Sequence, residues 1–239
     1  MRTAIQTLTT GLLALFLKSK CPLCDRPADA ELCEFCRRQL LRCQLNNPNH
    51  FWQESLPVFI WGRYNGTLKQ ALSALKYENQ PQLARPLGHW LAESWLKSST
   101  VPKSKKLIVF PIPLHPAKLQ QRGYNQAELI AQSFCQVTGY KHLPSGLERV
   151  RATEAQFGLS PQEREQNLID AFVIGKRGTH RLSSSSVLLL DDIYTTGATA
   201  RSAAQTLNRQ GIKVEGVVAI ASSKDSSHGK VKIIRGDRQ

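Results

Sequence analysis

The chain has 239 residues, of which 41% are apolar, and this is enough to bury a normal hydrophobic core. Its 32 Lys and Arg residues exceed its 18 Asp and Glu residues, giving a net charge of +14. This composition excludes a disordered chain, and the charge favours an anionic partner: nucleic acid, a phosphorylated metabolite or an acidic surface. We expect one main domain with a small appendage.

The N-terminal part of the chain differs in kind from the rest, because residues 1–50 contain five of the six cysteines. We therefore divide the chain into an N-terminal module, 1–50, and a main domain, 51–239. Thr10–Phe16 predicts a short helix. The apolar run Gly11–Leu17 is far shorter than the roughly 20 residues that cross a bilayer, and no small-residue cleavage site follows it. We expect no transmembrane segment and a cytoplasmic protein with reduced thiols.

Beyond the cysteines, the apolar pattern predicts alternating strands and helices. In chain order these are one or two strands in Leu56–Tyr64, helices Thr67–Lys76 and Leu83–Leu96, strand Leu107–Pro111, helix Gly123–Thr138, strand Val187–Leu190, helix Ala198–Gln210 and strand Val214–Ile220. Polar connectors are expected at Lys97–Lys106 and Lys176–Ser186. Continuous apolar strands are typical of parallel sheets that are buried on both faces. The succession predicts an α/β fold with a mainly parallel sheet flanked by helices.

Two CxxC motifs, separated by eight residues, are formed by Cys21, Cys24, Cys33 and Cys36. Two such knuckles supply the four thiolates of a tetrahedral zinc site, which would be closed and therefore structural rather than catalytic. Two disulfides, a redox CxxC and an iron–sulfur cluster are the alternatives. Reduced thiols disfavour the first, and the presence of two motifs without a thioredoxin-like context disfavours the second. Cys43 and Cys135 are typical of ordinary buried residues.

The segment Val187–Thr199, VLLLDDIYTTGAT, combines acids with a phosphate-binding turn. Asp191 and Asp192 close a predicted parallel strand, at the sheet edge where such folds bind ligands. Their carboxylates can accept hydrogen bonds from vicinal hydroxyls or steady a hydrated Mg²⁺. The helix N-terminus that follows suits a phosphate; its residues are Thr195, Thr196, Gly197, Ala198 and Thr199.

Two alternatives compete with this phosphate-binding interpretation. In a plain strand-to-helix turn, a threonine would cap the helix and the aspartates would face water. A P-loop nucleotidase is disfavoured because GxxxxGK[ST] is absent. The whole arrangement predicts a site for a phosphorylated, Mg²⁺-associated sugar.

VLLLDDIYTTGAT resembles the phosphoribosyl pyrophosphate (PRPP) signature of type I phosphoribosyltransferases. Together with the cysteine knuckles and with IPLHPAKLQQRGYNQAELIA at Ile112–Ala131, it makes the chain resemble the ComF family of competence-associated, phosphoribosyltransferase-like proteins. The resemblance runs from Cys21 to about Ile220. It implies a type I phosphoribosyltransferase-like fold, a structural Zn²⁺, and PRPP bound with Mg²⁺.

The resemblance also implies roles for individual residues. Asp191 and Asp192 would hold the ribose hydroxyls, and Thr195 to Thr199 would hold the 5-phosphate. The loop after Leu107–Pro111 would receive pyrophosphate, and the candidate residues of its segment Pro113–Asn125 are His115, Lys118, Arg122, Tyr124 and Asn125. For His115 and Lys118, a solvated loop is the alternative.

Two further segments border this predicted site. Leu147–Asn167 is expected to be loop-like at first and then helical. Within it, Arg149–Asn167 resembles the mobile loop that closes over the ligand, and an ordinary solvated loop is the alternative. The positions of interest are Arg151, Thr153, Gln156, Arg164 and Asn167. Lys76 is expected to be exposed, and contact with a phosphate is its alternative.

An enzyme of this kind would displace pyrophosphate from C1 of PRPP with a nitrogen nucleophile. Asp191, Asp192 and Arg122 would act as catalytic residues by positioning and electrostatics. The acceptor cannot be identified, so three functions stay open: a phosphoribosyltransferase, a non-catalytic PRPP or nucleotide sensor, and a DNA-handling component of the competence machinery. The last would have single-stranded DNA or competence proteins as partners, which the +14 charge permits.

Overall fold

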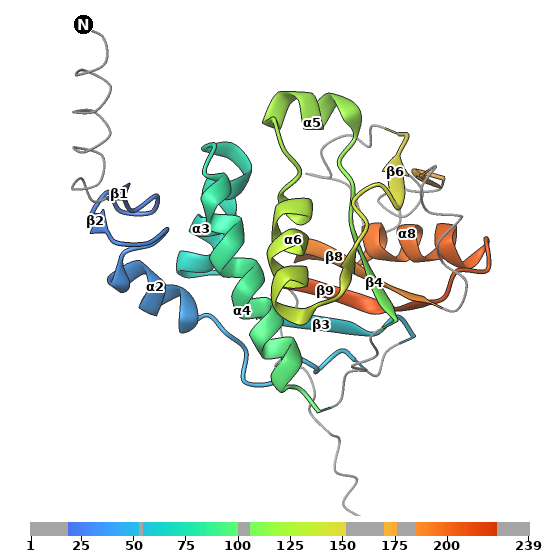
Figure 1. The fold of residues 1–239 in the computed structure, drawn as a ribbon, viewed down its shortest axis with the longest axis horizontal. Coiled ribbons are helices and arrows are strands. Elements are labelled where there is room, and N and C mark those ends of the chain that lie inside the picture. The colour runs from blue at the N-terminus through green and yellow to red at the C-terminus, as the bar shows by residue number, and fades with distance from the viewer. Residues whose placement is uncertain (1–18, 53–54, 100–105, 152–169, 176–184, 224–239) are drawn as a thin grey trace, which may run out of the picture.

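The computed structural model describes residues 19–52, 55–99, 106–151, 170–175 and 185–223. At its centre lies a five-stranded sheet with the order β3-β9-β8-β4-β5 (Figure 1). Its strands are β3 (Val58–Arg63), β4 (Leu107–Pro111), β5 (Lys141–His142), β8 (Ser186–Tyr194) and β9 (Val214–Ser222). All neighbouring strands pair in parallel, which confirms the predicted sheet type.

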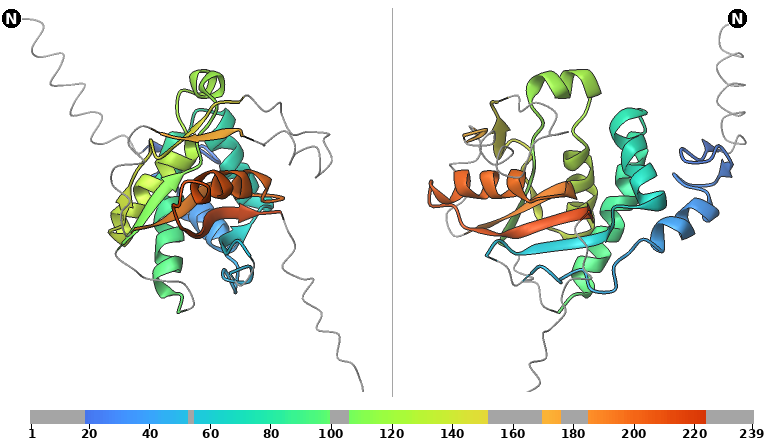
Figure 2. Two further views of the ribbon diagram at one scale, coloured as in Figure 1. Left: turned by 90° about the vertical axis from the view of Figure 1, so that its right-hand side faces the viewer. Right: turned by 180° about the vertical axis from the view of Figure 1, so that it is seen from behind.

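Helices cover both faces of the sheet, as Figures 1 and 2 show. They are α3 (Gly66–Tyr77), α4 (Ala84–Lys97), α6 (Gln126–Thr138) and α8 (Ala198–Asn208), with a short 3₁₀ turn, Pro81–Leu83, before α4. A further helix, α5 (Pro116–Arg122), buries none of its residues. Helices α3, α4 and α6 share one hydrophobic cluster with the sheet, and α8 shares the other. The sheet is therefore the middle layer of an α/β fold, as predicted.

The two clusters explain why the central strands are apolar without interruption. In β8, Leu188 and Leu190 belong to the cluster on the α3, α4 and α6 side, whereas Val187 and Leu189 belong to the cluster on the α8 side. Successive side chains of a strand point to opposite faces, so burial of both faces requires apolar residues at every position.

Strand β8 is longer than the predicted Val187–Leu190. It pairs with β9 as far as Tyr194, opposite Ser222. Asp191 and Asp192 therefore lie inside the strand rather than after it. Because they are neighbours in a strand, their side chains leave on opposite faces of the sheet.

Helix α5 replaces the loop that was predicted after β4. None of its residues is buried, so no hydrophobic periodicity marks it in the sequence. Its ends do carry signals: His115 caps it, Pro116 occupies its first position, and Gly123 ends it with φ 82°. The helix expected from Gly123 starts at Gln126 for the same reason, since Gly123 is left-handed and Asn125 is the N-cap.

A small antiparallel pair, β6 (Leu147–Arg149) with β7 (Phe172–Ile174), lies outside the main sheet. The first residues of the predicted loop Leu147–Asn167 thus form a strand. Residues 152–169, which include most of the predicted mobile loop, and residues 176–184 of the second connector lie outside the described residues.

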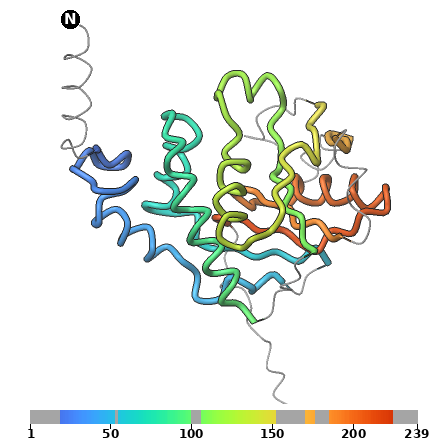
Figure 3. Tube along the Cα trace, in the orientation of Figure 1, coloured from blue at the N-terminus to red at the C-terminus, as the bar shows by residue number. Residues whose placement is uncertain are grey.

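The cysteine-rich segment forms a hairpin and a helix: β1 (Ser19–Lys20), β2 (Pro27–Ala28) and α2 (Glu34–Leu41). Figure 3 shows this segment, in blue, beside α3 and on the side of the molecule opposite α8. Gln70 of α3 donates a hydrogen bond to the carbonyl oxygen of Leu23 at 3.2 Å. The helix expected at Thr10–Phe16 lies outside the described residues. Within the described ranges, no helix has the length and apolar character needed to span a membrane.

Candidate functional site

The acid pair, defined as Asp191 and Asp192, meets a lysine from a distant helix. The Nζ atom of Lys76 lies 2.5 Å from Oδ2 of Asp192, and the two side chains are only 16% and 5% exposed. The expectation that Lys76 is exposed was therefore wrong. Leu72 and Leu75 bury the inner face of α3, and this packing places the last turn of the helix at the end of β8 that carries the acids. A local pattern in the sequence cannot predict this contact, because Lys76 and Asp192 lie far apart along the chain.

The surroundings of the acid pair shift the pKa values of its two carboxyl groups in opposite directions. Burial opposes ionisation of Asp192, but the charge of Lys76 and hydrogen bonds from Lys76, Asp191 and Gln126 outweigh it and lower its pKa. Burial, followed by the charge of Asp192, raises the pKa of Asp191 to about 8. Burial opposes the charge of Lys76 too, yet Asp192 and Asp191 raise its pKa overall. Asp192 is therefore the more readily ionised of the two, and it is the one that pairs with the Lys76 ammonium.

This separation gives the protein a testable pH dependence. The pKa of Asp191 rises from its ordinary value of 3.8 to about 8 in the folded chain, so the folded state binds the proton more tightly. The stability contributed by Asp191 is fully present below pH 3.8 and is lost as the pH rises through about 8. We expect wild type to lose stability relative to Asp191→Asn over this window, because asparagine cannot ionise. Urea unfolding of both proteins at matched pH values measures their free energies of unfolding. A difference between the two free energies that does not change with pH would contradict the raised pKa of Asp191.

Three further cations surround the acid pair. Burial lowers the pKa of Lys118, and the charges of Arg122, Arg149 and Lys76 lower it further, whereas the charge of Asp192 raises it. Lys118 therefore lies close enough to each of these groups for their charges to act on it. Burial also lowers the pKa of Arg149, against the opposing influence of Asp191. These cations come from α3, α5 and β6. With four cations against two acids, the site has a surplus of positive charge.

The turn after β8 forms a compact cradle at the start of α8. Gly197 has φ 81°, and a side chain there would collide with the hydroxyl group of Tyr194 and approach Arg201 to 3.0 Å. The Ala198 N–H donates to Oγ1 of Thr196 at 3.4 Å, and Arg201 donates to the Thr196 carbonyl oxygen at 2.9 Å. Helix amides and the helix dipole make such a turn suitable for a phosphate.

The geometry of the cradle agrees with one part of the plain strand-to-helix alternative and disagrees with another. Thr196 does bond to the backbone as a capping residue would, but Asp192 is buried and does not face water. Thr195 is exposed, whereas Thr199 is half-buried and Ala198 is buried. Arg201 was not singled out from the sequence; its only signal is a basic residue in the first turn of a helix that follows a glycine-containing loop.

Residues of the predicted pyrophosphate segment fall into two groups. His115, Tyr124 and Asn125 are engaged in structural hydrogen bonds: His115 Nδ1 accepts from the Ala117 N–H at 3.3 Å, the Tyr124 hydroxyl donates to the carbonyl oxygen of Leu75 on α3 at 2.6 Å, and Asn125 caps α6. Arg122 donates to the side chain of Gln126 and lies 5.4 Å from the ring centroid of Tyr77. The structure thus brings Lys118 and Arg122 toward the acid pair, and engages the other three in shaping the segment.

Four of the five residues singled out in the predicted mobile loop, Thr153, Gln156, Arg164 and Asn167, lie outside the described residues. The fifth, Arg151, is exposed. Arg149, the first residue of that predicted loop, is the one that reaches the acid pair electrostatically.

The four knuckle cysteines come together at the start of α2, where their sulfur atoms lie within 4.8 Å of one another. All four are free thiols, and the sulfur atoms of Cys24 and Cys33 are 3.5 Å apart. Sulfur atoms around a tetrahedral zinc ion with bonds of about 2.3 Å are separated by about 3.8 Å, so the cluster has the size of a metal site. The Cys36 N–H donates to Cys33 Sγ, and this is the main reason that the pKa of Cys33 falls to about 7. The cluster can hold a metal ion.

Comparison with known proteins shows to which family the chain belongs. It is 31% identical over 158 residues to Competence protein F of Haemophilus influenzae, an alignment that covers 65% of this chain and 68% of the relative. It is 31% identical over 197 residues to DNA utilization protein YhgH of Salmonella typhimurium, covering 81% of this chain and 79% of the relative. The chain belongs to the ComF family. No protein-family profile matches it.

Solved structures similar to this ComF-family chain include adenine phosphoribosyltransferases. That of Leishmania tarentolae is 14% identical, covers 75% of this chain and 94% of its own, and superimposes with a TM-score of 0.38. That of Leishmania donovani is 12% identical with a TM-score of 0.39, covering 75% of this chain and 86% of its own. At this level of similarity, the description of the fold rests on the strand order and register of the chain itself.

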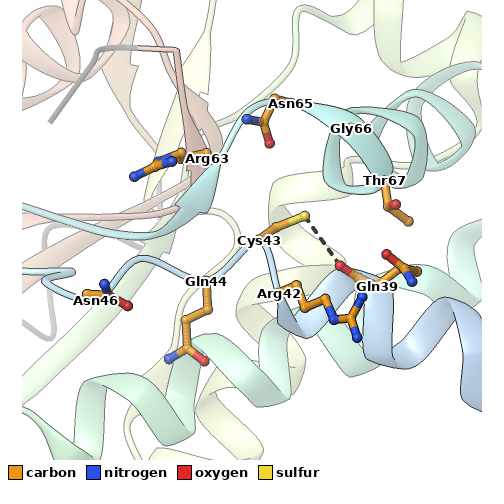
Figure 4. Close-up of a pocket in the computed structure, with 9 residues that line it drawn as sticks. All are labelled: Gln39, Arg42, Cys43, Gln44, Asn46, Arg63, Asn65, Gly66 and Thr67. Atoms are coloured by element: carbon orange, nitrogen blue, oxygen red, sulfur yellow. Dashed lines mark hydrogen bonds between the residues drawn. The ribbon is translucent and has the colours of Figure 1, made fainter. Parts of the chain in front are cut away.

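The ComF-family chain also has a separate hollow, of about 410 Å³, where α2 meets the start of α3. Figure 4 shows its polar lining, formed by Gln39, Arg42, Cys43, Gln44, Asn46, Arg63, Asn65, Gly66 and Thr67. The Cys43 thiol donates to the Gln39 carbonyl oxygen at 3.5 Å within it. Gly66 and Lys76 are separated by about 15 Å along α3, at about 1.5 Å per residue. The hollow and the acid pair therefore lie at opposite ends of one helix.

Proposed function

We propose that this ComF-family protein binds PRPP and transfers its phosphoribosyl group to a nitrogen acceptor. The observation that carries the proposal is the surplus of positive charge around the acid pair, next to the glycine turn that opens α8. PRPP presents a diol, a monophosphate and a pyrophosphate. A site with acids, a helix N-terminus and a group of cations offers a complementary partner for each.

The acid pair has capacity left for a sugar hydroxyl. Oδ2 of Asp192 is buried, and the Lys76 ammonium lies 2.5 Å from it. A carboxylate oxygen has two lone pairs, so a ribose hydroxyl can donate to it beside the Lys76 ammonium. This supports the assignment of the ribose diol to Asp191 and Asp192.

Two metals belong to the proposal. A structural Zn²⁺ fits the four thiolates of the cysteine cluster, in a module that we place at residues 1–50, before a main domain at 51–239. Mg²⁺ would enter with PRPP and be held by the oxygens of the ligand. The acid pair supplies oxygen ligands of the type that Mg²⁺ prefers, but the Lys76 ammonium already stands 2.5 Å from one of them.

In the proposed reaction the protein acts by orientation and charge. The acid pair fixes the ribose so that C1 faces the acceptor, while Lys118 and Arg122 stabilise the pyrophosphate that departs. When bound, Mg²⁺ would offset part of the same negative charge. The amides at the start of α8, with Thr195 to Thr199, retain the 5-phosphate throughout.

The pyrophosphate assignment is tested by calorimetric titration with two ligands, PRPP and ribose 5-phosphate. Lys118→Gln/Arg122→Gln is expected to weaken PRPP binding by about a hundredfold, because each charged hydrogen bond to the pyrophosphate contributes roughly 1.5 kcal/mol. Binding of ribose 5-phosphate, which has no pyrophosphate, should change little.

The matched control for this titration is Arg37→Gln/Arg38→Gln, which removes the same charge from the exposed surface of α2. An equal reduction in affinity for both ligands in the site variant would refute the pyrophosphate assignment. Failure of wild type to bind PRPP would refute the proposed function itself. Pyrophosphate release with a panel of purines, pyrimidines and amines then separates a transferase from a sensor, since binding without release indicates the sensor.

The names of the relatives refer to competence and to DNA utilization. We propose that this chain serves the same process. Its net charge of +14 supports contact with nucleic acid or with an acidic competence protein. This role is compatible with either a transferase or a sensor.

A further inference from the structure

The position of Lys76 is set by the packing of the residue that precedes it in α3. Leu75 is fully buried, and its carbonyl oxygen accepts the 2.6 Å hydrogen bond from the Tyr124 hydroxyl. The Lys76 side chain itself is 16% exposed. A lysine on a free helix face would keep its ammonium in water, so this one is held at the acid pair by the fold as well as by charge.

The Lys76 ammonium occupies the place where a metal ion would bind the acids directly. Mg²⁺ or Mn²⁺ on a carboxylate sits about 2.1 Å from the oxygen. The Nζ atom of Lys76 is 2.5 Å from Asp192 Oδ2, so a metal ion bound to that oxygen would lie within a few ångströms of a like charge. To bind there, the ion would have to push a largely buried ammonium away from its counter-ion, which is strongly unfavourable.

The surrounding charge adds to this effect. Lys118 lies close enough to Lys76 and Asp192, and Arg149 close enough to Asp191, for their charges to act on one another, and Arg122 acts on Lys118. A free divalent cation that approaches the acid pair meets this positive field, whereas an anionic ligand is drawn toward it.

We propose that the ammonium group of Lys76 serves as a built-in cation of the acid pair, which excludes a directly bound divalent metal and reserves the carboxylates for ligand hydroxyls. The exclusion of metal stands on the geometry of the free protein. The reservation for hydroxyls rests on the function proposed above.

The experiment titrates full-length, zinc-loaded protein with Mn²⁺ alone and follows bound Mn²⁺ by electron paramagnetic resonance. Wild type should show no Mn²⁺ site at the acid pair, and Lys76→Met should bind Mn²⁺ at least about tenfold more tightly, because the acids then lack the cation that contacts them directly. Lys76→Arg, which keeps the charge, should behave as wild type. Lys76→Met/Asp192→Asn should lose the gained site, which locates it at the acid pair.

Two outcomes would overturn the inference: Mn²⁺ binding to wild type that Asp191→Asn abolishes, or a folded Lys76→Met that binds Mn²⁺ no better than wild type. The first needs no variant at Lys76, so the inference can be refuted even if Lys76→Met fails to fold. Because Mn²⁺ is the only ligand, the result is independent of PRPP. Absence of PRPP binding would refute the proposed function and leave the Mn²⁺ result standing.

Discussion

Removal of metal from the cysteine cluster is expected to abolish the ordered structure of the β1–β2 hairpin and α2. Four thiols within 4.8 Å of one another pack stably only if a cation joins them, because thiolates repel and buried thiols lack strong partners. Structural zinc in zinc-finger peptides has an apparent binding free energy of roughly 10–16 kcal/mol. If only a third of that appears as local stability, amide protection in Cys21–Leu41 should fall by about a thousandfold.

Hydrogen exchange before and after chelation, with metal analysis for one Zn²⁺ per chain, checks this result. Cys24→Ser/Cys36→Ser should reproduce the effect of chelation. Cys43→Ser is the matched control, since Cys43 lies outside the cluster and bonds only to the Gln39 carbonyl among the interactions described for its thiol. Full protection of Cys21–Leu41 in metal-free protein would show that the cluster needs no metal.

Replacing Asp192 by asparagine is expected to destabilise the protein by about 3–5 kcal/mol, because the Lys76 charge then remains largely buried without its counter-ion. The neighbouring Asp191→Asn should cost much less at pH 7, since the pKa of Asp191 is about 8 and asparagine resembles its protonated form. Lys76→Met/Asp192→Asn should recover most of the stability, because the charge and its partner leave together.

Urea unfolding of wild type, both single variants at the acid pair, Lys76→Met and the double variant measures this coupling as a double-mutant cycle. The contrast between two adjacent, chemically identical side chains is the informative part. Equal destabilisation by Asp191→Asn and Asp192→Asn would mean that Lys76 does not discriminate between the two carboxyl groups.

The sequence allowed the layered fold and the location of the cysteine cluster to be predicted, because both depend on local spacing. The uninterrupted apolar run at Val187–Leu190 indicated a strand buried on both faces, and the spacing of two CxxC motifs indicated four converging thiols. Each of these patterns lies within a short segment of the sequence, so it can be recognised without knowledge of the tertiary structure.

The remainder of the site depends on tertiary packing, which short segments do not record. Lys76 has the helical spacing of a surface residue, yet the arrangement of α3 against the sheet brings its ammonium to Asp192. Helix α5 buries no residue, so only its caps, Pro116 and Gly123, could have revealed it. Arg149 was included as the start of a mobile loop, and its place on β6 depends on pairing with Phe172.

Helix α3 contacts both the cysteine-rich segment and the acid pair. Near its middle, Gln70 bonds to Leu23 between the knuckle cysteines, its first residues line the polar hollow, and its last turn delivers Lys76 to the acid pair. If a ligand at one end of α3 binds better to one position of the helix, it changes the affinity for a ligand at the other end. By thermodynamic reciprocity, the second ligand then changes the affinity for the first by the same factor. In this sense, helix α3 connects the cysteine cluster with the acid pair.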